Sequence, residues 1–223
     1  MYSGRLVTLP LKQVLPVLVL LAGSSAMGWE QELDLRQVRK LPDESQATDY
    51  YTLGRDARGL FVHALYRPGN MAIKRGFEVP PEHSHEHHRL RWRWRALVLP
   101  VGGDECDADK RDSAGSVYVL WRRGLRTYGL KYSWSTVGKL GAICDRWNNP
   151  IIKGETVILE TGGPRTWVDE SLDLDEEFRK HFEDGDPQAK VPRLIGIAIL
   201  TDGDQTQTPS SADFGSFVLS SVP

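Results

Sequence analysis

The stretch Leu90-Arg91-Trp92-Arg93-Trp94-Arg95-Ala96-Leu97-Val98-Leu99-Pro100 gives the clearest strand signal in this chain of 223 residues. Apolar and arginine side chains alternate over its first seven positions, and successive side chains of a strand point to opposite faces. One face is therefore expected in the core and carries Leu90, Trp92, Trp94 and Ala96. The other face is expected to be polar and carries Arg91, Arg93 and Arg95.

Short strand patterns recur along the rest of the chain. They are expected at residues 59–66, 71–77, 116–121, 130–134, 194–200 and 214–219. Segments 156–160 and 166–172 are predicted to pair through a turn at Gly162-Gly163-Pro164. Segment 194–200 is apolar throughout, which predicts a strand buried on both faces.

One helix is expected late in the chain. Asp173 can cap its first turn, and Glu176 stands three residues further on, as in a capping box. Phe178 and Phe182 are four residues apart and would share one helix face. Many short strands with a single late helix predict a mostly β fold, as a β-sandwich or jelly roll.

The first 28 residues have the pattern of a signal peptide. Arg5 and Lys12 precede an apolar run at 14–22, and small residues follow at 23–26. The run is shorter than the about 20 residues that span a bilayer. We expect cleavage before Met27 or Trp29 and a single domain at 29–223, periplasmic or secreted and not integral to the membrane. An uncleaved N-terminal anchor is the alternative.

Charge and cysteine content limit the partners and the compartment further. The formal net charge of -2 argues against a nucleic-acid binder, which needs a basic stripe. An oxidising compartment would permit one disulfide between Cys106 and Cys144. Two free buried thiols remain the alternative, because sequence does not show how close the two residues come.

The segment 90–95 resembles the signature strand of a bacterial family known as domain-of-unknown-function family 3047. Further segments resemble motifs of that family, in the same order along the chain. They are Asp112 before a Val-Tyr-Val strand, Tyr132 and Trp134 in a Tyr-x-Trp strand, Trp167 before acidic residues, the helix at 175–182, GIAILTDGD at 196–204, and Ala212 with Gly215 in the last strand. The resemblance runs from residue 29 to residue 219.

This resemblance implies an exported protein with a jelly-roll fold akin to carbohydrate-binding modules. It implies no established activity. Ser216 stands where the family typically has an acidic residue, so a polar or metal site that uses that carboxylate is not expected here.

A histidine-rich stretch precedes the strand at residue 90. His83, His85, His87 and His88 lie within six residues, and imidazoles so close can bind Zn, Cu or Ni. The stretch follows two prolines and lacks the partner motif of a closed site. We therefore favour a solvated, exposed loop over a metal centre.

The segment Thr201-Asp202-Gly203-Asp204-Gln205-Thr206 could begin a Ca²⁺ loop, because oxygen ligands alternate along it. A third acid and a closing glutamate are missing from the pattern. We favour a turn in which Asp202 and Asp204 accept backbone N–H bonds. No cofactor is therefore expected, with Ca²⁺ or a transition metal as the alternative.

Three arginines on one strand face repel each other and require acidic partners or an anionic ligand. We predict a ligand groove in which the arginines meet nearby aspartates beside an aromatic wall. The predicted binding residues are Arg91, Arg93, Arg95, Asp112, Tyr132, Trp134, Asp202 and Asp204. The alternative is a surface ladder of ion pairs, each of which contributes little to stability.

The sequence contains no nucleophile elbow, phosphate-binding loop or dinucleotide fingerprint, and no catalytic residue is assigned. We predict a non-catalytic binding domain for a glycan or another cell-envelope polymer. One alternative is a glycan hydrolase with a carboxylate pair among Asp112, Asp202 and Asp204. The other is a structural envelope protein whose tryptophans only fill the core. An exposed Trp134 beside Asp202 would favour the binder.

Overall fold

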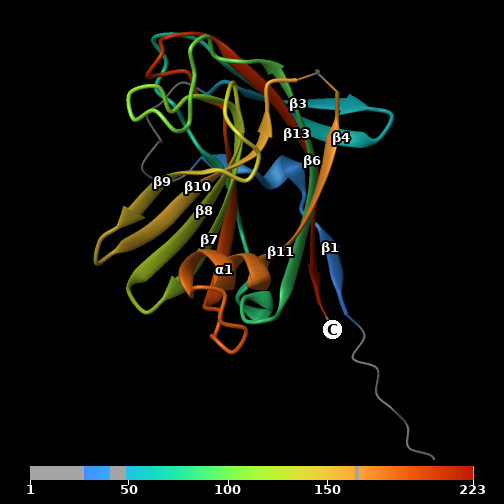
Figure 1. Cartoon of the computed structure of the whole chain (residues 1–223). Coiled ribbons are helices and arrows are strands. Elements are labelled where there is room, and N and C mark those ends of the chain that lie inside the picture. The colour runs from blue at the N-terminus through green and yellow to red at the C-terminus, as the bar shows by residue number, and fades with distance from the viewer. Residues whose placement is uncertain (1–27, 41–48, 164–165, 223) are drawn as a thin grey trace, which may run out of the picture.

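The computed structural model describes residues 28–40, 49–163 and 166–222, where two β-sheets enclose a hydrophobic core (Figure 1). The expected signal peptide lies outside the described residues, apart from Gly28. The mostly β, sandwich-like fold predicted from the strand pattern is confirmed.

The first sheet, called sheet A, has the order β11-β6-β13-β4-β3, and β1 also pairs with β13. Its strands are β1 (Glu30–Glu32), β3 (Tyr51–Asp56), β4 (Gly59–Tyr66), β6 (His88–Val98), β11 (Val168–Asp173) and β13 (Ser210–Ser221). Strand β4 has the predicted bounds, whereas β6 begins two residues before the predicted start.

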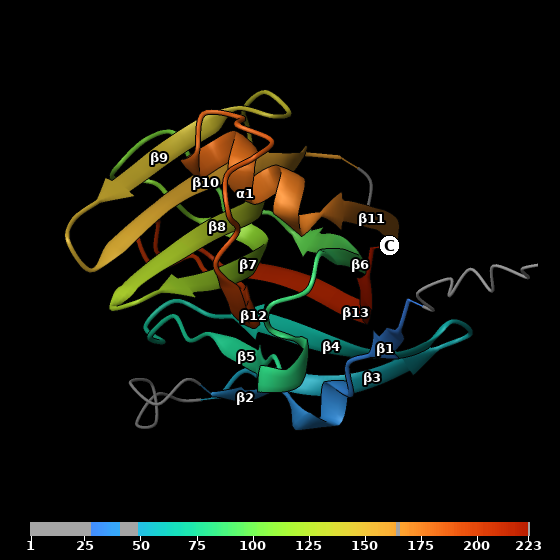
Figure 2. The same ribbon diagram turned by 90° about the horizontal axis from the view of Figure 1, so that it is seen from below.

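The second sheet, called sheet B, has the order β2-β5-β12-β7-β8-β10-β9. Its strands are β2 (Arg39–Lys40), β5 (Arg75–Glu78), β7 (Ser113–Arg123), β8 (Arg126–Ser135), β9 (Ile143–Asn148), β10 (Ile152–Thr161) and β12 (Arg193–Leu200). In the part of the chain that the structure describes, two short 3-10 helices, η1 (Leu35–Gln37) and η3 (Pro81–His83), connect strands. Figure 2 shows the two sheets from below, with sheet B running from β9 to β2.

Two strand predictions need correction. Strand β5 begins at Arg75 rather than at residue 71, because the backbone of Ile73 bonds to the hydroxyl groups of Tyr50 and Tyr51 instead of a neighbouring strand. Segments 156–160 and 166–172 do not pair with each other. Strand β10 pairs with β8 and β9, whereas β11 crosses to sheet A and pairs with β6.

The core lies between the inner faces of the two sheets. Trp92 and Trp94 are 2% and 0% exposed, which confirms the predicted buried face of β6. From sheet B, Trp134 meets Trp94 at a ring distance of 5.4 Å. Aromatic packing of this kind fills the interior with large apolar surfaces in fixed contact.

The predicted late helix is α1 (Leu174–Phe182), and it begins where expected. The side chain of Asp173 accepts hydrogen bonds from the backbone N–H groups of Asp175 and Glu176, at 3.2 and 3.1 Å. Phe178 packs against Trp121 of sheet B at 5.4 Å. The helix thereby closes one end of the sandwich between the two sheets (Figure 1).

Cys106 and Cys144 form the predicted disulfide, with Cα atoms 4.3 Å apart. The bridge joins the loop before β7 to β9, which is the edge strand of sheet B. Among the described residues, no helix has the length and apolar character needed to cross a membrane.

Candidate functional site

The arginines of β6 lie on the outer face of sheet A, but their partners differ from the prediction. Arg91 pairs with Glu30, Arg93 with Asp56 and Arg95 with Asp213. The hydrogen bonds from Arg93 lower the pKa of Asp56 to about 2. The expectation that Asp112, Asp202 and Asp204 neutralise these arginines is therefore wrong.

Arg93 is also far less accessible than predicted. Its side chain is 0% exposed, and its guanidinium lies 4.0 Å from the ring centre of Trp167. A Cβ atom on the neighbouring Gly215 would come within 3.0 Å of Arg93 Nε. Trp167 covers the arginine from outside and Gly215 leaves room for it on the sheet. Arg93 is therefore enclosed by its neighbours, which indicates a structural role, although it lies on the polar face of the strand.

The predicted aromatic wall is not part of this face. Tyr132 and Trp134 project from β8 of sheet B into the core and are 0% and 2% exposed. The indole of Trp134 donates to the carbonyl oxygen of Gly162 at 2.8 Å, and the hydroxyl of Tyr132 donates to Glu177 at 3.0 Å. The predicted groove of arginines, aspartates and these aromatics is therefore wrong as a single site.

The three predicted aspartates do come together. Asp112 precedes β7, whereas Asp202 and Asp204 follow β12, and these strands are antiparallel neighbours. One carboxylate oxygen from each lies within 4.8 Å of the others. Burial raises the pKa of Asp202 to about 7. Oxygen ligands of this kind could hold a hard cation such as Ca²⁺.

The four histidines do not converge on a common point in the described contacts. His87 contacts Asp173 at 2.7 Å, and His88 bonds to the backbone oxygen of His83. His83 also packs against Trp29, at a ring distance of 4.1 Å, while His85 is exposed. The predicted exposed loop is wrong for His88, which is 2% exposed and begins β6.

A row of residues in register crosses the outer face of sheet B. Strand by strand from β5 to β9, the row is Glu78, Gly196, Leu120, Gly129, Gly154 and Trp147. Five inter-strand steps of about 4.8 Å give the row a length of about 24 Å. Glycine weakens a strand interior and often marks the close approach of a ligand or of another backbone.

Trp147 lies directly over one of these glycines. A Cβ atom on Gly154 would lie 2.5 Å from Cε3 of Trp147, so only glycine leaves room for the indole in this position. The tryptophan is 37% exposed. Its ring therefore rests on the backbone of β10 and keeps apolar surface open to solvent.

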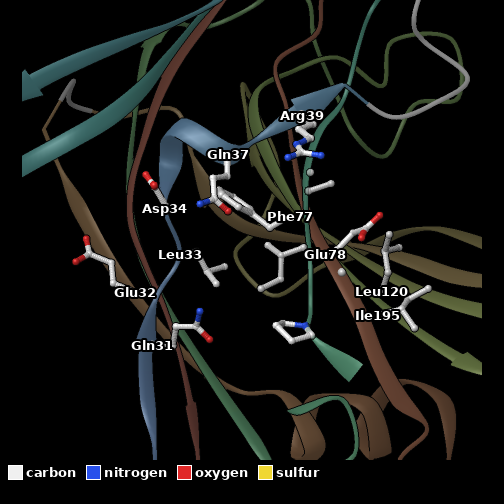
Figure 3. A pocket seen from close by; sticks show the side chains of 15 residues that line it. Gln31, Glu32, Leu33, Asp34, Gln37, Arg39, Phe77, Glu78, Leu120 and Ile195 are labelled. Carbon is white, nitrogen blue, oxygen red and sulfur yellow. The ribbon is translucent and has the colours of Figure 1, made fainter. Parts of the chain in front are cut away.

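Two cavities lie along this row. We call the row together with its two cavities the sheet B groove. The smaller, of about 340 Å³, is lined by Lys74, Tyr118, Leu120, Thr127, Gly129, Trp147, Asn149, Ile152, Gly154 and Ala198. The larger, of about 580 Å³, shares Leu120 and Ala198 with it and extends to segment 31–39. Figure 3 shows the larger cavity, lined by Gln31, Leu33 and Gln37 from segment 31–39, by Phe77 and Glu78 from β5, and by Leu120 and Ile195.

A buried ion pair adjoins the groove. Lys131 stands beside Tyr118 and Thr156 in the next row of the same face. Its Nζ donates to Glu105 at 2.8 Å, and both side chains are buried. Burial alone would lower the pKa of Lys131, but the Glu105 carboxylate raises it above its usual value. Glu105 precedes Cys106, so the disulfide holds this part of the loop near β9.

Sequence comparison decides the family. The family described as "Protein of unknown function (DUF3047)" matches residues 28–218. The chain belongs to this family. The match confirms the resemblance seen in the sequence motifs. None of the curated proteins compared with this DUF3047 protein matches it.

Solved structures match this DUF3047 protein at low similarity. The xyloglucanase domain of NopAA from Sinorhizobium fredii, in complex with cellobiose, is 11% identical with a TM-score of 0.38, covering 87% of this chain and 99% of that one. ENZbleach xylanase is 10% identical with a TM-score of 0.40, covering 86% and 87%. Endoglucanase cel12A from Rhodothermus marinus is 11% identical with a TM-score of 0.38, covering 79% and 86%.

The DUF3047 protein also has a pair of glutamates with raised pKa values, outside the lining of the two cavities. Glu170 of β11 accepts a hydrogen bond from the indole of Trp94 at 3.0 Å. Burial raises its pKa to about 7, and the negative charge of Glu160 adds to the effect. Burial also raises the pKa of Glu160. Neither residue lines the two cavities.

Glu170 gives the fold a predictable pH dependence. Its pKa is higher in the folded chain, about 7, than the ordinary value of 4.5, so the folded state holds a proton that the unfolded chain releases. The contribution of Glu170 to stability is thus complete below pH 4.5 and is lost as the pH rises through 7. Glu170→Gln should flatten this decline in urea-denaturation midpoints, whereas exposed Glu176→Gln should not. A decline of unchanged steepness in Glu170→Gln would contradict this assignment.

Proposed function

We propose that the protein binds a linear glycan in the sheet B groove without cleaving it. The observation that carries this proposal is the exposed indole of Trp147, laid over Gly154 at one end of the glycine-rich row. A sugar ring has apolar faces that stack on such an indole, while its hydroxyl groups need polar partners. The length of the row, about 24 Å, favours a chain over a single sugar.

The lining of the smaller cavity has the mixed character that a glycan requires. Trp147, Tyr118 and Leu120 supply apolar and aromatic surface. Lys74 and Asn149 supply polar groups beside it. Binding sites for small molecules and polymers commonly combine a mainly apolar lining with a few placed polar groups. The groove therefore fits a ligand that presents both kinds of surface.

The placement of the carboxylates relative to Trp147 favours binding over hydrolysis. Glycosidases generally need two carboxyl groups on either side of the scissile bond. Among the described residues, the lining of the smaller cavity, where Trp147 lies, includes no aspartate or glutamate, whereas Glu32, Asp34 and Glu78 line the larger cavity. Asp112 and Asp202 are buried, at 0% and 5% exposure, and so are closed to a polymer. A hydrolase would need a carboxylate pair from the larger cavity, away from Trp147, or a pair outside the groove such as Glu160 and Glu170, whose raised pKa suits a general acid.

Removal of the tryptophan side chain tests the proposal. On an array of cell-envelope and plant glycans, the wild-type chain is expected to retain at least one linear glycan. Trp147→Ala should weaken that binding by about tenfold or more, because the stacking surface is lost. Trp147→Phe keeps an aromatic ring and should restore part of the affinity. The melting temperature should change little, since the indole is 37% exposed.

The control is Leu53→Ala, an exposed apolar residue on sheet A that is 51% exposed, against 37% for Trp147. It should bind as the wild type does. If Trp147→Ala bound the glycan as tightly as the wild type, the groove would not be the binding site. If the wild type bound no glycan at all, a structural role would be favoured. Release of shortened sugars from the bound glycan, abolished by Glu170→Gln, would favour the hydrolase.

We also propose that the protein works outside the bacterial cytoplasm. The charged, apolar and small-residue segments of positions 1–28 support export, and the Cys106–Cys144 bridge is consistent with an oxidising compartment. N-terminal sequencing of chain recovered from the periplasm should start at Met27 or Trp29. An intact Met1 on membrane-bound chain would contradict cleavage.

A further inference from the structure

Two neighbouring hairpin turns at one end of sheet B expose large apolar side chains. The β7–β8 turn carries Leu125, which is 94% exposed, and the β9–β10 turn carries Ile151, which is 66% exposed. A hydrogen bond of 2.8 Å from Thr127 N to Ile151 O holds the two turns together. Figure 1 shows both hairpins projecting from the body of the sandwich. Together, Leu125 and Ile151 form what we call the apolar tip.

The backbone fixes the apolar tip in its outward position. Arg123 pairs directly with Arg126, so only Gly124 and Leu125 form the turn between β7 and β8. Gly124 has a φ of 60°, which glycine adopts readily in a two-residue hairpin turn. So tight a turn leaves Leu125 at its extreme end, where the hairpin offers it no apolar neighbour to pack against.

Positive charge surrounds the apolar tip. The turn reads Arg122-Arg123-Gly124-Leu125-Arg126, with three arginines in five residues. Arg123 is paired with Glu183. Arg126 donates to the backbone oxygen of Asn149 at 3.1 Å, and Arg122 donates to the hydroxyl of Thr127 at 3.5 Å. In these contacts, Arg122 and Arg126 bond to a hydroxyl group and a carbonyl oxygen rather than to a carboxylate.

We propose that the apolar tip and its arginines dock the protein on an anionic lipid surface. A convex apolar tip fits the boundary between headgroups and acyl chains, into which Leu125 and Ile151 can insert side by side. Arginines placed just behind the tip would then meet the lipid phosphates. Neither signal alone holds a protein at a membrane, because shallow insertion of two side chains is weak and needs electrostatic support. The docking is thus reversible and salt-sensitive, and the apolar tip adjoins the glycan groove, whose smaller cavity is lined by Thr127 and Asn149.

A single fluorescent label tests the docking in the full chain. The sequence has two cysteines, and both are used in the disulfide, so one introduced cysteine can be labelled selectively. Leu125→Cys and Ile151→Cys, each carrying a polarity-sensitive dye, should show blue-shifted, brighter emission with vesicles of phosphatidylcholine and phosphatidylglycerol. A label at Leu53→Cys, on sheet A, should not respond. The local label separates the tip from any membrane contact made by residues 1–27.

The charge requirement is tested with the same labels. Vesicles of phosphatidylcholine alone, high salt, or the double variant Arg122→Gln, Arg126→Gln should each lower the response. With the label at Ile151→Cys, the further change Leu125→Asp should weaken vesicle binding by about tenfold or more, because the transfer of a leucine side chain from water is lost. Unchanged emission at both tip positions, or an equal response to neutral and anionic vesicles, would overturn the proposal.

Discussion

Trp94→Ala is expected to lower the free energy of unfolding by about 3–5 kcal/mol, the usual cost of removing a large buried aromatic side chain. Trp94 is 0% exposed and lies between the sheets, 5.9 Å from the ring of Trp92 and 5.4 Å from that of Trp134. Its indole N–H also donates a hydrogen bond to the carboxyl group of Glu170. The loss is a large share of the total stability of an ordinary domain, so much of the variant should be unfolded.

Urea denaturation followed by circular dichroism measures this loss. Trp147→Ala is the matched control, because it removes the same side chain from a position that is 37% exposed. We expect the control to lose far less stability. Similar losses in the two variants would mean that Trp94 does not occupy the interior between the sheets.

Lys131→Met is expected to destabilise the fold by about 3–5 kcal/mol, because it leaves a buried charge without its partner. The Glu105 side chain is 1% exposed and has Lys131 as its ion-pair partner at 2.8 Å. Asp202 would also lose the positive charge that now lowers its pKa. Surface ion pairs behave differently, since water replaces the lost partner.

A double variant separates the ion pair from simple packing. Lys131→Met combined with Glu105→Gln removes both charges and should recover much of the stability lost in Lys131→Met. As a surface comparison, Lys110→Met breaks the exposed pair with Asp107 and should change stability by less than about 1 kcal/mol. Strictly additive losses in the double variant would show that the two side chains do not interact.

The parts of the fold that sequence predicted are those set by local pattern. The alternation of β6 correctly placed Trp92 and Trp94 inside, because a strand assigns its faces by position alone. Asp173 correctly marked the start of α1, because its cap bonds reach only two and three residues ahead. The edge strand β9 was missed, since its segment Ile143–Asn148 lacks a regular apolar alternation.

The candidate site was harder to predict because it depends on which strands are neighbours. Gly129, Gly154 and Trp147 form one row only when β8, β10 and β9 adopt their observed register. The burial of Arg93 depends on Trp167, which lies more than 70 residues further along the chain. The same face-alternation rule, applied to segment 130–134, would have placed Trp134 inside with Leu130 and Tyr132.

The most direct test of the glycan-binding account is an NMR titration of the isotope-labelled chain with a glycan retained on the array. The account predicts that the largest shift changes occur at the amides of Gly129 and Gly154 and at the indole N–H of Trp147, which lie together in the sheet B groove. Changes confined to the outer face of sheet A, around Arg95 and Trp167, with none at these three residues, would contradict it.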